Sequence, residues 1–317
     1  MFYIETVRFG DLRAYRVVNS DTKQLFSIIP GFGTLINELA LSKKGRTHQV
    51  IQGYSSYEDL AREFSTTYRG ANLFPFTGVI KEGAYSFRGK SYSLSKNAPN
   101  HRNALHGYLY NRKFEIIRVE TSAEKGILET QYKEDGSYLP YPFSFEISVE
   151  FELEKSGFRC TTLIENTGKD AMPIGQGWHP YFKATGKTDE MLLKLPATEY
   201  LELDKDLCPT GVKKDLDKFR ESEKIGPTSL DTVFTLEKKK GIRKTYLFDP
   251  DSSMKIVLWQ ETGENKYNYL TVYTPQTRDS IAMEPWTCPP DAFNNKMDLI
   301  ILDPGEKLEL AFGISLE

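Results

Sequence analysis

The strictest alternation of apolar and polar side chains in this sequence is Phe143-Ser144-Phe145-Glu146-Ile147-Ser148-Val149-Glu150-Phe151-Glu152-Leu153. Apolar residues at every second position give a β-strand one buried face and one solvated face. The polar stretch Glu154-Lys155-Ser156-Gly157 follows as a turn, and Phe158–Glu165 then resumes a strand-like pattern. These residues predict an antiparallel β-hairpin.

Short apolar runs of strand length recur along the chain, separated by residues that favour turns. They are Tyr15–Val18, Leu25–Ile29, Leu35–Leu41, Phe114–Glu120, Ile127–Tyr132, Lys255–Trp259, Leu270–Tyr273, Ser280–Met283, Leu299–Leu302 and Leu308–Ile314. The clearest predicted helix is Ser55–Phe64, where Ser55 and Glu58 have the spacing of a capping box. Strands and helices do not alternate, and no linker rich in Gly, Ser or Pro divides the chain. The sequence therefore predicts an all-β fold, a large antiparallel β-sandwich with few short helices, as a single domain over residues 1–317.

The composition argues against several classes of protein. The chain has 317 residues and a formal net charge of −3, which disfavours nucleic acid or an anionic membrane as the main partner. No run approaches the roughly 20 apolar residues of a membrane-spanning helix, and no signal-peptide pattern opens the sequence. The three cysteines, Cys160, Cys208 and Cys288, suggest neither a disulfide framework nor a CxxC metal motif. We expect a cytoplasmic monomer or homodimer with reduced thiols.

One of the four histidines, His179, lies within Gly175-Gln176-Gly177-Trp178-His179-Pro180-Tyr181-Phe182. The proline favours an extended backbone at His179, and the two glycines permit close approach of a neighbouring segment. Flat aromatic side chains beside a titratable group suit a sugar, which has apolar C–H faces and hydroxyl edges. Trp178 and Tyr181 are therefore candidate sugar-binding residues. A buried, hydrogen-bonded structural histidine is the alternative interpretation.

Two further stretches carry candidate site residues. Glu284 ends an apolar strand and precedes Pro285, so we expect its carboxylate to point into the core or into a cleft. Burial there raises the pKa of a carboxyl group toward that of a base active near neutral pH. Trp286 offers another aromatic face beside it, and His106 lies in the loop-like stretch Asn103–Gly107. The alternative for Glu284 is a strand-end glutamate paired with a backbone N–H or a lysine.

Together these stretches resemble the aldose 1-epimerase, or galactose mutarotase, family. The resemblance rests on Asn103–Gly107, Gly177–Phe182 and Glu284–Thr287, which occur in the family's order. Weaker matches at Pro30–Leu35, Tyr273–Pro275 and Leu302–Glu306 extend the similarity over nearly the whole chain. The resemblance implies the galactose mutarotase-like supersandwich, a very large twisted antiparallel sandwich with a sugar cleft on one face.

The resemblance also implies a reaction, the interconversion of the α and β anomers of an aldose. Opening a hemiacetal ring requires removal of a proton from the C1 hydroxyl and delivery of a proton to the ring oxygen. By similarity Glu284 is the base and His179 the acid, with their roles exchanged for ring closure. His106 is expected to hydrogen-bond near the ring oxygen, and Asp231 to orient the sugar hydroxyls. The family's chemistry needs no cofactor, and we expect no metal, although two histidines and a carboxylate also occur at zinc or iron sites.

Gly78 and Val79 depart from the family pattern, because family members typically carry Asn and a substrate-binding Arg there. Valine offers no hydrogen-bond donor in place of a guanidinium group. Either Lys81 or Arg69 reaches the cleft, or the substrate differs from galactose and glucose, or catalysis is weak or absent. Two alternatives to an aldose 1-epimerase therefore stay open: a non-catalytic carbohydrate-binding or regulatory protein, and a hexose-phosphate epimerase. The second is disfavoured because no cluster of Lys or Arg lies near the three motifs.

Overall fold

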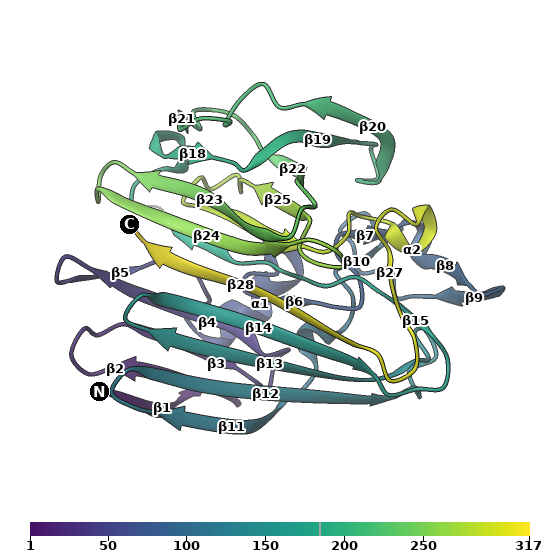
Figure 1. Ribbon diagram of the computed structural model, residues 1–317, viewed down its shortest axis with the longest axis horizontal. Helices are drawn as coiled ribbons and strands as arrows, with labels where there is room; N and C mark the ends of the chain where they lie inside the picture. The colour runs from purple at the N-terminus through teal and green to yellow at the C-terminus, as the bar shows by residue number, and fades with distance from the viewer. Residues whose placement is uncertain (184) are drawn as a thin grey trace.

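The computed structural model describes residues 1–183 and 185–317, which form mainly antiparallel β-strands (Figure 1). The largest sheet has nine strands, which lie one above the other in Figure 1 from β11 at the bottom to β21 at the top. In spatial order they are β11 (Glu115–Thr121), β12 (Lys125–Asp135), β13 (Ser144–Glu154), β14 (Gly157–Asn166), β28 (Lys307–Leu316), β24 (Met254–Thr262), β23 (Gly241–Asp249), β18 (Leu192–Lys194) and β21 (Glu223–Lys224). The predicted hairpin is confirmed as β13 and β14, in which Leu153 pairs with Phe158.

Two other large sheets share the core with the nine-stranded sheet. The first has five strands in sequence order, β1 (Phe2–Phe9), β2 (Leu12–Asn19), β3 (Leu25–Ile29), β4 (Leu35–Lys43) and β5 (Arg46–Gln49). The second has eight strands. These are β20 (Pro209–Asp215), β19 (Ala197–Leu203), β22 (Asp231–Leu236), β25 (Tyr269–Tyr273), β26 (Ser280–Trp286), β16 (Gly177–Trp178) and β6 (Asn72–Leu73), with β17 (Tyr181–Lys183) paired to β26. The predicted all-β antiparallel fold is thereby confirmed.

Small elements connect the sheets and close the ends of the sandwich. Three two-stranded sheets pair β7 (Val79–Ile80) with β10 (Ala104–Leu105), β8 (Ala84–Phe87) with β9 (Lys90–Ser93), and β15 (Met172–Ile174) with β27 (Ile300–Leu302). The short helices are α2 (Ala292–Asn295) and the 3-10 turns η1 (Lys81–Gly83), η2 (Leu109–Asn111) and η3 (Thr188–Glu190). None of the helices in residues 1–183 and 185–317 is long and apolar enough to cross a membrane.

The hydrophobic core lies between the nine-stranded sheet and the other two large sheets. The odd-numbered residues of β13 from Phe145 to Leu153 are at most 1% exposed, as the period-two pattern predicts. Phe151 contacts Phe26 of the five-stranded sheet and Trp178 of the eight-stranded sheet, so this one side chain joins all three layers. Because the inner face of the eight-stranded sheet is filled by this core, its outer face remains available for a site.

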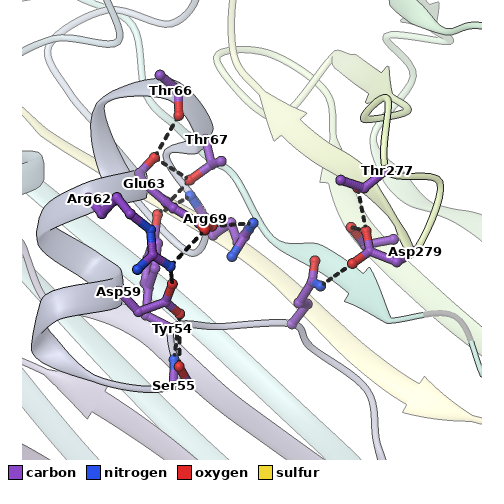
Figure 2. Close-up of polar contacts among 12 residues, drawn as sticks. Tyr54, Ser55, Asp59, Arg62, Glu63, Thr66, Thr67, Arg69, Thr277 and Asp279 are labelled. Atoms are coloured by element: carbon purple, nitrogen blue, oxygen red, sulfur yellow. Dashed lines mark hydrogen bonds and ion pairs between the residues drawn. The ribbon is translucent and has the colours of Figure 1, made fainter.

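The predicted helix is present but shifted along the chain, since α1 spans Tyr57–Thr67. Ser56 caps it, and its side chain accepts a hydrogen bond from the backbone N–H of Asp59. Ser55 instead donates both its backbone N–H and its hydroxyl to the Asp59 carboxylate (Figure 2). The capping pair is therefore one residue later than the sequence suggested, because Asp59 fills the position that was assigned to a glutamate.

The strands β19 and β20 gave no clear sequence signal. Most side chains of β20 are exposed, because this strand is the edge of its sheet and faces solvent on both sides. An edge strand with no buried face lacks the alternation that identifies a strand in sequence. Its charged side chains also discourage pairing with another chain.

We expect Phe151→Ala to lower the free energy of unfolding by about 3–5 kcal/mol, because it empties the position at which three sheets meet. Denaturant unfolding of the purified variant measures this change. Leu139→Ala is the matched control, since Leu139 is 80% exposed and its truncation should cost under about 0.5 kcal/mol. Equal and small effects of the two substitutions would contradict the assigned core.

Candidate active site

Strand register on the outer face of the eight-stranded sheet brings most of the candidate residues together. Asp231 of β22 lies opposite Tyr273 of β25. Two residues away on β25, Thr271 lies opposite Val233 of β22 on one side and Glu284 of β26 on the other. The residues that alternate with them on β25 and β26 belong to the core. The period of two therefore separates an outer face that carries the candidate residues from an apolar inner face.

These side chains line a cavity of about 230 Å³ on that outer face. Segments far apart in sequence complete it, including the end of α1, the β7 entry at Gly78 and the β10 segment. Six of the seven sequence-predicted site residues line the cavity: His106, His179, Tyr181, Asp231, Glu284 and Trp286.

Trp178 does not line the cavity, and the expectation that it contacts the sugar is corrected here. Its side chain is 0% exposed and packs against Phe151 and Phe312 in the core. Its indole N–H donates to the Thr162 hydroxyl at 3.4 Å. Because Trp178 precedes His179 in an extended segment, the two side chains point to opposite faces of the sheet.

His179 and Glu284 form the centre of the cavity. The His179 Nε2 atom lies 3.4 Å from Glu284 Oε2, and the side chains are 8% and 2% exposed. The Glu284 Oε2 and His179 Nδ1 atoms have no hydrogen-bond partner within the described residues. The His179 backbone is fixed on both sides, since its N–H donates to Ala71 and its carbonyl accepts from Gly70. Two positioned groups with unsatisfied polar atoms are thus available to a ligand.

Burial sets the protonation of this pair. It raises the pKa of the Glu284 carboxyl well above its usual range, and the nearby Asp231 charge raises it further. Burial also lowers the pKa of the His179 imidazole to about 3. Both shifts favour uncharged groups, because an apolar surrounding penalises the charged form of each. Burial therefore favours the form of the pair in which Glu284 carries the proton beside a neutral imidazole.

His106 is a neutral hydrogen-bond donor by the same reasoning. Burial and the neighbouring His179 lower its pKa well below the usual range. Its Nδ1 atom accepts a hydrogen bond from the Gly78 N–H at 3.3 Å, while its backbone N–H donates to the Gly78 carbonyl. A neutral imidazole that accepts at Nδ1 carries its hydrogen on Nε2. The ring lies 5.3 Å from that of His179 between centroids, so this donor serves the same cavity.

The remaining predicted residues form the walls. Asp231 is solvent-accessible at the rim, and partial desolvation by the surrounding wall raises the pKa of its carboxyl. Tyr181 stacks on His179, with centroids 5.2 Å apart and ring planes 10° apart. Trp286 lies over Gly177, where an added Cβ would stand 2.5 Å from the indole Cδ1 atom. Gly177 was predicted to allow close approach of a neighbouring segment, and the Trp286 ring leaves no room for a side chain there.

Neither cation considered as a replacement for the missing arginine lines the cavity. Lys81 Nζ lies 3.4 Å from Asp204 Oδ2. Arg69 pairs with Glu63 at 2.8 Å beside α1 (Figure 2). Val79 itself lines the cavity, and none of the described lining residues is Lys or Arg. The described lining residues therefore bring carboxyl and imidazole groups into the cavity but no Lys or Arg side chain.

Sequence reasoning missed Thr271, Tyr273 and Tyr68 as cavity residues. The Thr271 hydroxyl is buried without a hydrogen-bond partner in the described part of the chain. The alternation of Thr271 and Tyr273 with apolar neighbours was a usable signal, because it places both on the face of Glu284. Tyr68 could not be found this way, since it follows α1 and reaches His106 only through the tertiary fold, at 4.9 Å between ring centroids.

Two histidines and a carboxylate are also residue types that bind metal ions. Within the described residues, no three or more His, Cys, Asp or Glu side chains are grouped so that they could hold one. The three cysteines are buried free thiols.

Comparison with known proteins identifies the family of this chain. Residues 16–315 match the family model of the aldose 1-epimerases. An aldose 1-epimerase of Streptococcus thermophilus is 24% identical across 98% of this chain and 96% of that protein. The uncharacterized protein YihR of Escherichia coli (strain K12) is 28% identical over 261 residues, 80% of each chain.

Solved structures show the same fold. A galactose mutarotase-like protein from Clostridium acetobutylicum superposes with a TM-score of 0.87 at 19% identity, over 100% of this chain and 98% of that one. A galactose 1-epimerase from Lactobacillus acidophilus gives 0.79 at 16% identity, over 100% and 98%. The architecture is thus a galactose mutarotase-like sandwich. The chain belongs to the aldose 1-epimerase family, and its function is that of an aldose epimerase-like isomerase.

We expect Glu284→Gln to be more stable than the wild type at alkaline pH, by a margin that shrinks toward acid pH. A carboxyl whose pKa is raised by folding stabilises the protein fully below its unfolded pKa, about 4.3, and loses that contribution as pH rises through the folded value. Glutamine does not titrate. Urea unfolding from about pH 5 to about pH 9 measures the difference. Exposed Glu124→Gln is the control, and a pH-independent difference for Glu284→Gln contradicts the buried acid.

Proposed function

We propose that this protein interconverts the α and β anomers of a free, uncharged aldose, with Glu284 and His179 as the acid/base pair. The observation that supports it best is the 3.4 Å approach of their Nε2 and Oε2 atoms inside a sugar-sized cavity. Anomerisation requires two proton transfers at neighbouring oxygens of one carbon, and two buried groups at this separation can serve both.

Ring opening begins from the ionised form of the pair. Glu284 as carboxylate takes the proton of the C1 hydroxyl, and imidazolium His179 donates its proton to the ring oxygen as the bond from C1 to that oxygen breaks. The product is an open-chain aldehyde beside a protonated Glu284 and a neutral His179. This is the protonation that burial favours in the empty cavity. Sugar binding must therefore move one proton from Glu284 to His179 before opening.

Ring closure reverses these transfers on the other face of the aldehyde. After rotation about the bond between C1 and C2, neutral His179 takes the proton of the former ring hydroxyl as its oxygen attacks C1. Protonated Glu284 then donates to the carbonyl oxygen, which regenerates the C1 hydroxyl. His106 donates from Nε2 to a sugar oxygen near the reacting centre. Asp231 accepts sugar hydroxyls at the rim, while Tyr181 and Trp286 offer flat apolar faces.

The charge of the cavity supports an uncharged substrate. Asp231 and Glu284 line it, and none of the described lining residues is a cation. A phosphate group requires Arg, Lys or a helix N-terminus for recognition. The hexose-phosphate alternative therefore has less support than a free aldose.

We also propose that the protein acts in the cytoplasm as a monomer or homodimer, without a nucleic-acid or membrane partner. The near-neutral net charge of −3 supports the absence of a polyanionic partner.

The decisive experiment measures exchange between the α and β anomer signals of free aldoses by NMR. We expect the wild type to accelerate exchange, and Glu284→Gln or His179→Asn to reduce it by about 10²–10⁴-fold, the usual contribution of general acid–base catalysis. Glu124→Gln and His101→Asn are matched controls, because both native residues are exposed. Sugar binding without acceleration by the wild type would instead support the non-catalytic carbohydrate-binding alternative.

A second experiment tests the substrate charge. We expect hexose 6-phosphates to be poorer substrates than the corresponding free hexoses by about tenfold or more in kcat/KM, since the described lining residues include carboxyl groups and no Lys or Arg. The same NMR assay with paired free and phosphorylated sugars measures this ratio. A preference for the phosphorylated member of a pair would reverse the assignment to an uncharged aldose.

A further inference from the structure

A second cavity lies on the other side of the segment that carries His106. Its volume is about 300 Å³. Leu105 and His106 line the active-site cavity, whereas Ala104, Gly107 and Tyr108 line this second one. The same short segment therefore separates two hollows that share none of their lining residues.

Two buried polar atoms in this second cavity lack a hydrogen-bond partner within the described residues. They are the Tyr108 hydroxyl and the Arg112 Nε atom. Tyr108 is only 7% exposed. Buried polar atoms are nearly always paired in folded proteins, because an unpaired one forfeits its hydration without compensation. Both residues line the cavity, so a molecule bound there lies beside them.

The Arg112 guanidinium has no ion pair and donates no hydrogen bond to any described residue, which is unusual for a half-buried arginine. It lies over the rings of Tyr108 and Tyr138, 5.5 Å from each centroid. These contacts orient the guanidinium but leave its N–H groups free. Glu134 adds negative charge near Tyr108 but accepts its hydrogen bond from Tyr132 and lines a different surface hollow.

The chemistry of these groups defines the ligand. Burial raises the pKa of the Tyr108 hydroxyl, which therefore stays protonated and can donate. A guanidinium fork beside a hydroxyl donor matches the oxygens of a carboxylate or phosphate. The rim carries exposed polar residues, Ser95 and Asn111, and the volume reaches the lower end of the range for small-molecule sites, roughly 300 Å³.

We propose that this second cavity binds a small organic anion through Arg112 and the hydroxyl of Tyr108. The ligand carries one carboxylate or phosphate group on a body no larger than a monosaccharide. The proposal is independent of the proposed function, because neither Arg112 nor Tyr108 lines the cavity that holds His179 and Glu284.

Calorimetric titration with open-chain polyols tests it, since these cannot undergo anomerisation. The probes are gluconate for a carboxylate, sorbitol 6-phosphate for a phosphate, and sorbitol as the uncharged control. We expect the wild type to bind one of the two anions, or both, at a single site and not to bind sorbitol. Arg112→Gln should weaken that binding about tenfold or more, the loss expected for a charge-assisted contact.

Tyr108→Phe keeps the test decisive if Arg112→Gln does not fold. It removes a hydroxyl that has no hydrogen-bond partner among the described residues, so the variant should be at least as stable as the wild type. We expect it to bind the anion several-fold more weakly. Arg13→Gln and Tyr3→Phe are matched controls on exposed residues.

The outcomes separate clearly. Binding of gluconate alone assigns a carboxylate ligand, and binding of sorbitol 6-phosphate alone assigns a phosphate ligand. No binding of either anion at millimolar concentration overturns the proposal. Binding that is equal in the wild type, Arg112→Gln and Tyr108→Phe also overturns it, because the anion then lies elsewhere.

Discussion

The burial of one carboxyl group, Glu284, against one imidazole, His179, is the constraint on which the site depends. An apolar surrounding penalises a charge on either group, so burial favours a protonated Glu284 beside a neutral His179. The cost of charging them is low only when a bound molecule supplies hydrogen bonds to both. In the proposed mechanism, burial therefore ties the ionised form of the pair to the presence of a sugar.

The sandwich maintains that constraint through strand alternation. The inner face of β25 and β26 is sealed by the core in which Phe151 joins three sheets, so the strands cannot shift by one residue without burying Glu284 in the core. Glu284 faces Thr271 in register, and the Trp286 ring closes over Gly177. The sheet thus supplies the proposed acid/base pair, while loops and the end of α1 supply the remaining walls.

The parts of the fold that sequence predicted well are those whose signal is local. The alternation in β13 identified the hairpin, and the strand-end position of Glu284 correctly implied burial. Alternation alone places Trp178 and its neighbour His179 on opposite faces of the sheet, which is why Trp178 lies in the core and not beside the cavity. That the chain folds as one domain stays a prediction.

The features that sequence could not supply depend on long-range contacts. Lys81 pairs with Asp204 and Arg69 pairs with Glu63, and neither cation lines the cavity. These pairings join residues of different segments and have no local sequence signal. That Arg112 lacks an ion-pair partner among the described residues likewise follows only from the tertiary structure.

Carbon-13 NMR of the Glu284 carboxyl, assigned by comparison with Glu284→Gln, measures the central claim directly. At neutral pH the resonance should lie at the position of a protonated carboxyl in the free protein. Saturating aldose should move it toward the carboxylate position as the proton passes to His179. A carboxylate resonance in the free protein at neutral pH would contradict the account of a buried pair that shares one proton.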